Sequence, residues 1–121
     1  MQLPLGQYIA VRKSTDSGRT WQTLQLLQGT DGGATRPQLS VSGTHVAVAF
    51  IGAYCLSFNQ CSEAPYLSVS SNGGASWTGP RRLDTSAFDV LVAQDGERTW
   101  VAWERGGMMP LKMTVDGGAT C

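Results

Sequence analysis

Three cysteines are the residues of this chain best suited to covalent chemistry. Cys55 and Cys61 bracket the short polar segment CLSFNQC, a spacing that suits a disulfide pinning a loop in an oxidising compartment. Two unpaired loop thiols are the alternative, and Cys121 is left over in either case. No second pair of cysteines or histidines accompanies them, so we expect no zinc site.

A second candidate for chemistry is an acidic turn that occurs three times. It reads STDSGRTW at residues 14–21, SSNGGASW at 70–77 and TVDGGATC at 114–121. Aspartate, glycine and hydroxyl residues also line calcium loops, but such loops need further acids at alternate positions and a closing glutamate, which are absent. We therefore expect structural roles for Asp16 and Asp116, and no metal or cofactor.

The residue types of the repeated turn each have a mechanical reason. In the first copy, Ser14 and Asp16 can bond backbone amides, Gly18 can take a positive φ, Thr20 re-enters a strand and Trp21 offers an apolar wedge. The corresponding residues are Ser70, Asn72, Gly74, Ser76 and Trp77 in the second copy, and Thr114, Asp116, Gly118 and Thr120 in the third, where Cys121 replaces the tryptophan. The motif predicts a hairpin turn closed by hydrogen bonds, with the tryptophan side chain packed beside it.

Composition narrows the class of protein. The 121 residues carry nine Lys and Arg against nine Asp and Glu, with no charged block, which argues against nucleic acid and membrane surfaces as partners. No apolar run approaches the roughly 18 residues of a spanning helix, and residues 1–14 lack the features of a signal peptide. The chain reads as soluble and β-rich.

The spacing of the turns predicts the architecture. Their centres, at positions 16, 72 and 116, lie roughly 50 residues apart, a period typical of propeller blades. Strand-like runs precede every turn and follow the first two. A further hairpin is predicted in each of two segments, RPQLSVSGTHVAVAF and FDVLVAQDGERTWVAW. With blade strands named A to D, residues 1–29 supply C-D, 30–84 supply A-B-C-D and 85–121 supply A-B-C. The segment with Cys55 and Cys61 is expected to be an enlarged B–C loop.

The repeated turn resembles the Asp box, or BNR repeat, of the sialidase superfamily of β-propellers, and the first copy matches at every signature position. The resemblance implies all-β, four-stranded antiparallel blades, here about two and a half of an incomplete ring. It also implies a secreted or periplasmic parent protein that acts on or binds glycans. If that parent is an enzyme, the resemblance implies a glycoside hydrolase of the exo-sialidase type.

Catalytic residues do not carry over from the resemblance. Sialidases hold the sugar carboxylate with three arginines and use a tyrosine nucleophile with a glutamate and an aspartate. Their first arginine lies in an Arg-Ile-Pro motif, whereas Arg36 stands in Thr-Arg-Pro, and no Tyr, Glu and Arg set matches residue by residue. We predict no complete catalytic set in this chain.

Strand direction predicts where a ligand would bind. The Asp boxes lie at one end of each blade and the longer loops at the other, because consecutive strands are antiparallel. The candidates at the loop end are Arg36 and Asp89 at the starts of A strands, Tyr54, Glu104 and Arg105 just after B strands, and Tyr66 at the start of a C strand. Solvated loop charges are the alternative for Arg36, Glu104 and Arg105.

Three hypotheses of function follow. The first is a glycan-binding or glycan-hydrolysing propeller, the second is a non-catalytic propeller that binds another protein, and the third is an intact cytosolic structural module with reduced cysteines. The first two leave apolar blade faces and strand edges uncovered near residues 7–13 and 110–115, so we expect either self-association through these ends or a marginally folded chain.

Overall fold

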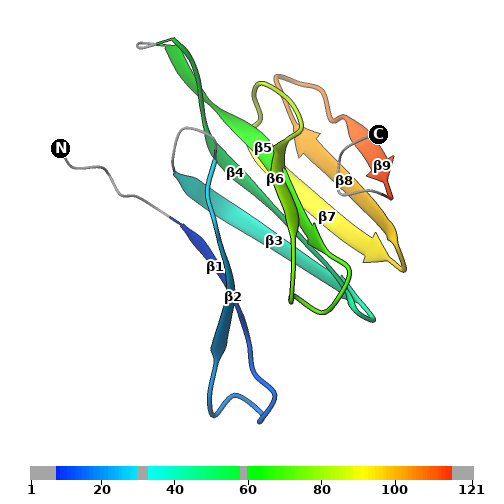
Figure 1. Ribbon diagram of the computed structural model, residues 1–121. Helices are drawn as coiled ribbons and strands as arrows, with labels where there is room; N and C mark the ends of the chain where they lie inside the picture. Colours follow the sequence, from blue (N-terminus) through cyan, green and yellow to red (C-terminus); the bar gives the residue numbers. More distant parts are fainter. Residues whose placement is uncertain (1–7, 30–32, 58–59, 116–121) are drawn as a thin grey trace, which may run out of the picture.

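The computed structural model describes residues 8–29, 33–57 and 60–115, which form nine strands and no helix (Figure 1). The strands are β1 (Ile9–Lys13), β2 (Gln22–Leu27), β3 (Ala34–Ser42), β4 (His45–Ser57), β5 (Gln60–Ser70), β6 (Thr78–Arg82), β7 (Asp89–Asp95), β8 (Arg98–Glu104) and β9 (Leu111–Thr114). No helix long and apolar enough to cross a membrane is found in these three ranges. The predicted all-β class is confirmed.

The strands form three antiparallel sheets of two, four and three strands. Their orders are β1-β2, β3-β4-β5-β6 and β7-β8-β9, so every strand pairs with its neighbour in sequence. The strand grouping expected from the repeated turns, two then four then three, is therefore present. Turns 14–21 and 70–77, two copies of the repeated sequence, connect β1 to β2 and β5 to β6.

The prediction that the segment with Cys55 and Cys61 is an enlarged B–C loop is wrong. The surplus residues lengthen the strands instead: β4 runs on to Ser57 and β5 begins at Gln60, so the two form a long hairpin that projects beyond the sheet (Figure 1). Cys55 lies directly opposite Cys61 in the ladder. The longer strands also change the places of two candidates: Tyr54 lies within β4 rather than just after it, and Tyr66 lies within β5 rather than at its start.

The centre of the four-stranded sheet is buried on both faces, because the apolar run in β4 alternates between two neighbouring sheets. Ala47, Ala49 and Ile51 face β7 and β8, where they pack with Val90 and Trp103. The small alanines let the two sheets approach closely. The three sheets thus stack side by side, with β3–β6 in the middle (Figure 1).

The opposite face of the middle sheet packs against β1 and β2. Val48 and Phe50 of β4 meet Leu27 of β2 and Ile9 of β1 there. The rings of Phe50 and Tyr66 stack with centroids 5.5 Å apart and an interplanar angle of 11°. This second core ties the first hairpin to the middle sheet.

Candidate ligand-binding end

The first copy of the repeated turn, residues 14–21, closes the β1–β2 hairpin with short hydrogen bonds; we call this copy the first box and residues 70–77 the second box. The Asp16 carboxylate accepts from the amides of Arg19 and Thr20, at 3.0 and 2.9 Å, and from the Thr20 hydroxyl at 2.6 Å. The Ser14 hydroxyl accepts from the amide of Gly18 at 2.8 Å, and Gly18 has φ of 88°. Hydrogen bonds from Thr20 and Ser14 lower the pKa of Asp16 to about 2. The Asp16 carboxylate is therefore engaged by hydrogen bonds within its own turn.

The second box makes the equivalent bonds with an amide in place of the carboxylate. Asn72 accepts from the amide of Ser76 at 2.9 Å and donates to the Ser76 hydroxyl at 2.8 Å. The Ser70 hydroxyl accepts from the amide of Gly74 at 2.8 Å. In the third copy Thr114 is buried in β9, whereas Asp116, Gly118 and Thr120 lie outside the described residues.

The two box tryptophans differ in packing. Trp77 is half-buried against the β1–β2 side of the core, and its indole nitrogen donates to the Gly74 carbonyl at 3.0 Å. Trp21 is 59% exposed, so the predicted wedge is wrong for this residue. The reason is that its turn extends past the middle sheet, as the lower end of the β1–β2 hairpin in Figure 1 shows.

The end opposite the boxes, which we call the loop end, holds the tip of the β4–β5 hairpin, the connection 83–88 and the β8–β9 turn (Figure 1). Arg36 lies here in a bulge of β3 with φ of 53°. Its guanidinium donates to the Phe88 carbonyl at 2.7 Å, which ties β3 to the start of β7. The side chain thus has a structural contact within the chain.

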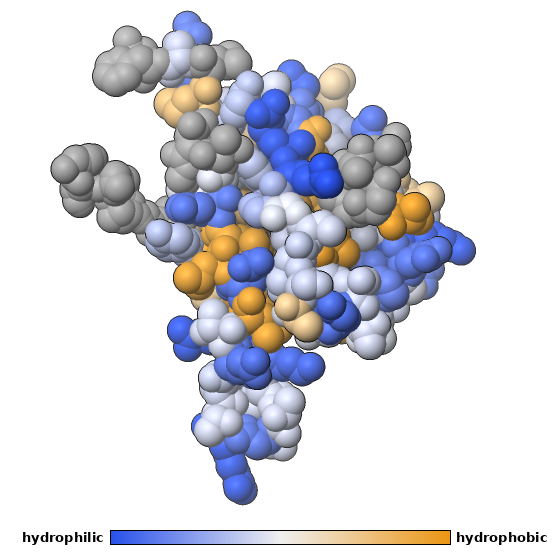
Figure 2. Space-filling model, viewed as in Figure 1, coloured by the Kyte–Doolittle hydropathy of each residue, from blue (hydrophilic) through white to orange (hydrophobic). Residues whose placement is uncertain are grey.

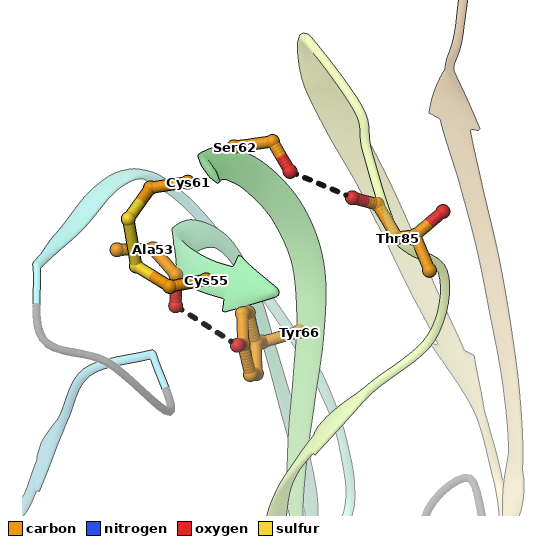
Figure 3. The surroundings of a disulfide bond; sticks show 6 residues. All are labelled: Ala53, Cys55, Cys61, Ser62, Tyr66 and Thr85. Atoms are coloured by element: carbon orange, nitrogen blue, oxygen red, sulfur yellow. Dashed lines mark hydrogen bonds between the residues drawn. A yellow bond between two sulfur atoms is a disulfide. The ribbon is translucent and has the colours of Figure 1, made fainter. Parts of the chain in front are cut away.

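The two tyrosine candidates have different surroundings. Tyr54 is half-buried, and the guanidinium carbon of Arg82 lies 3.7 Å from the centre of its ring. Tyr66 is only 1% exposed, and its hydroxyl donates to the Ala53 carbonyl at 3.1 Å (Figure 3). Tyr66 is a core residue that an outside ligand does not reach, and only Tyr54 stands near the surface.

A disulfide joins Cys55 to Cys61, with Cα atoms 3.9 Å apart, near the tip of the β4–β5 hairpin (Figure 3). The neighbouring Ser62 hydroxyl donates to the Thr85 carbonyl at 3.0 Å. Together these bonds hold the projecting hairpin and attach β5 to the connection that leads into β7.

An aspartate that sequence reasoning missed organises the connection 83–88. The Asp84 carboxylate accepts from the Trp103 indole and from Arg105, both at 2.8 Å, and from the amide of Thr85 at 2.7 Å. Burial acts to raise the pKa of Asp84, but these hydrogen bonds and the Arg105 charge outweigh it, so the pKa is lowered. Arg105 is thereby engaged in an ion pair, and no local sequence signal marks Asp84.

The candidates Asp89 and Glu104 are brought together. They are opposite each other in the β7–β8 ladder, and both are exposed. A hollow of about 90 Å³ beside them is also lined by Leu91 and Met109. Like charges directly opposite in a ladder are destabilising, so this pair has no structural advantage. Carboxylates only accept hydrogen bonds, which suits a ligand rich in hydroxyl groups.

The described ranges contain no group of three or more metal-binding side chains. Comparison of the chain with protein-family models, curated proteins and solved structures finds no match. The loop end therefore presents a carboxylate pair, a tyrosine covered by an arginine and two engaged arginines. In the part of the chain that the structure describes, these groups do not form the three-arginine and tyrosine arrangement of a sialidase site.

Proposed function

We propose that the three sheets are successive blades of a sialidase-like Asp-box propeller. In this assignment residues 1–29 supply the C and D strands of one blade, 30–84 form a complete blade and 85–121 supply the A, B and C strands of the next. The observation that carries the proposal is the pair of boxes: both close a C–D hairpin at the same end of the stack, with equivalent hydrogen bonds from Asp16 and Asn72.

The proposed activity is glycan binding at the loop end, in a protein exported to an oxidising compartment. Asp89 and Glu104 supply acceptors for sugar hydroxyls, and Tyr54 and Arg82 stand at the same end. The Cys55–Cys61 bond supports export only weakly. Hydrolysis is not assigned to this chain, because Arg36 and Arg105 are held by internal contacts and Tyr66 is buried.

A glycan array followed by calorimetry tests this proposal. We expect a hit whose affinity falls at least tenfold in the Asp89→Asn, Glu104→Gln double variant, because both acceptors change. Asp95→Asn is the matched control, since Asp95 is an exposed acid at the other end of the same strand and its loss leaves binding unchanged. An array without hits, or equal loss in the control, refutes the proposal. Turnover of a fluorogenic sialoside that disappears in Arg36→Ala refutes the absence of a catalytic set.

The second candidate function is a non-catalytic module that binds a protein. Exposed apolar side chains at the loop end favour it: Phe88, Met108 and Met109 are each at least 60% exposed. Apolar groups beside charged ones are common at protein interfaces. A protein captured by the wild type and lost with Phe88→Glu, together with an empty glycan array, supports this function over the first.

A further inference from the structure

Among the described residues, two apolar surfaces of the sheet stack have no strand packed against them, and the first is a groove between β1 and β3. It consists of two adjoining hollows of about 580 and 250 Å³. Their lining includes Arg12, Lys13, Leu39, Val41, Val46 and Val48. Leu39 is 62% and Val41 is 57% exposed. Figure 2 shows apolar atoms gathered where β1 meets the middle sheet.

The second surface is the outer face of the β7–β9 sheet, on the side away from β3–β6. Side chains alternate across a sheet, so Val101 and Trp103 point inward while Trp100 and Ala102 point outward. The ladder aligns two rows on this outer face: Leu91, Ala102 and Leu111, and then Ala93, Trp100 and Met113. A face with water as its only neighbour is normally polar, and this one is apolar.

The stacking inside the chain indicates what fits the groove. One face of β3–β6 is covered by the three strands β7–β9, whereas the other is covered by only β1 and β2. Leu39 and Val41 of β3 lie on that second face, in register with Val48 and Val46. They stay exposed because no described strand lies between them and the free edge of β1. A further sheet placed beside β1 would cover the side chains of Leu39 and Val41.

The outer face of β7–β9 has the orientation that this position requires. Within the chain, one face of the β3–β6 sheet packs against the following sheet, β7–β9. The outer face of β7–β9 is the equivalent face of that following sheet, so it is the face that would pack against a further sheet. If β7–β9 of a second copy lies beside β1, the same stacking step is repeated and its outer face meets Leu39 and Val41. Each uncovered surface thereby covers the other.

The charges of the two surfaces are complementary. Among the described residues the groove is lined by Arg12 and Lys13 and by no acid. By alternation the outer face carries Asp89, Asp95 and Glu104 against one cation, Arg98. Opposite potentials favour this pairing and oppose the contact of two outer faces with each other.

We propose that this chain associates head to tail, with the outer face of β7–β9 of one copy docked in the β1–β3 groove of the next. The contact is heterologous, so it closes into a ring or continues as a chain of copies. It depends on how the sheets stack and requires no glycan binding. Asp89 and Glu104 belong to both proposed surfaces, but Leu39→Glu changes neither of them, so the two proposals are tested separately.

Light scattering coupled to size exclusion tests the proposal with two complementary variants. At about 50 µM we expect the wild type to exceed the 12.9 kDa of one chain at least twofold. Leu39→Glu blocks the groove and Trp100→Glu blocks the outer face, so each variant alone is monomeric. Mixed one to one, they form a heterodimer and nothing larger, because the outer face of the first variant still fits the groove of the second.

The control is Met108→Glu, an exposed apolar residue in the β8–β9 turn that belongs to neither surface, and we expect it to assemble as the wild type does. A wild type that stays monomeric overturns the proposal and assigns the surfaces to other strands. Association of Leu39→Glu with itself overturns it as well, because that indicates contact between like faces. Thermal unfolding verifies that each variant is folded, and Val41→Thr with Met113→Thr replaces any variant that is not.

Discussion

Gly29 and Gly52 lie backbone against backbone where the end of β2 reaches β4. A Cβ atom on Gly52 would lie 2.7 Å from the Gly29 Cα and 3.0 Å from the ring of Tyr66. Real Cβ atoms do not approach a backbone so closely, so any larger residue must push the β1–β2 hairpin away from the middle sheet. This contact sets the spacing of the second core.

Gly52→Ala is therefore expected to lower the free energy of unfolding by about 1–3 kcal/mol, the usual result of overpacking a filled site. Chemical denaturation measures the change. Ala75→Ser serves as a control at an exposed position and should change stability by less than about 0.5 kcal/mol. Equal stability of Gly52→Ala and the wild type would mean that the two sheets are not in close contact.

The two box tryptophans provide a matched pair of substitutions. Trp77→Ala removes a half-buried ring that packs on the core, and we expect a loss of about 3 kcal/mol, the low end for large aromatic residues. Trp21→Ala removes a ring that is 59% exposed and should cost less than about 1 kcal/mol. Urea unfolding of both variants measures the two losses of stability. Equal losses of unfolding free energy would contradict the different packing of the two tryptophans.

The strands and turns were predictable because their signals are local. Asp16 and Asn72 bond amides within four residues of themselves, so sequence alone places the closed turns and the flanking strands. The site was less predictable, because its contacts join distant residues. Arg36 meets the Phe88 carbonyl and Asp84 meets Trp103 only after the sheets have stacked. The exposure of Trp21 likewise depends on which sheets lie beside it.

Asp84 bonds one buried partner, the Trp103 indole, and one exposed partner, Arg105, so the contributions of the two bonds to stability can be compared. Asp84→Ala leaves the indole N–H of Trp103, a residue only 3% exposed, without its acceptor, and we expect a loss of about 1–3 kcal/mol. Arg105→Ala removes an ion-pair partner whose side chain is 43% exposed, and should cost about 0–1 kcal/mol. Guanidinium unfolding ranks the two, and a larger loss for Arg105→Ala would show that charge rather than the indole bond holds the connection.

Asp16 predicts how stability depends on pH. Its pKa in the folded chain is about 2 against an ordinary 3.8, because the Thr20 hydroxyl and amide and the Ser14 hydroxyl stabilise the carboxylate. A depressed pKa contributes stability that is fully present above about pH 4 and is lost as the pH falls toward 2. The lowered pKa of Asp84 acts in the same direction.

Asp16→Asn isolates the contribution of the first box. Asn72 already makes the equivalent bonds in the second box, so the variant should keep the turn while losing the titrating group. We expect its unfolding temperature to fall less than that of the wild type between pH 4 and pH 2, with the two profiles parallel above pH 5. Carbon-13 NMR of the Asp16 carboxyl should give a midpoint near 2. A midpoint near 3.8, or identical acid profiles, would show that the box does not hold the carboxylate in the folded protein.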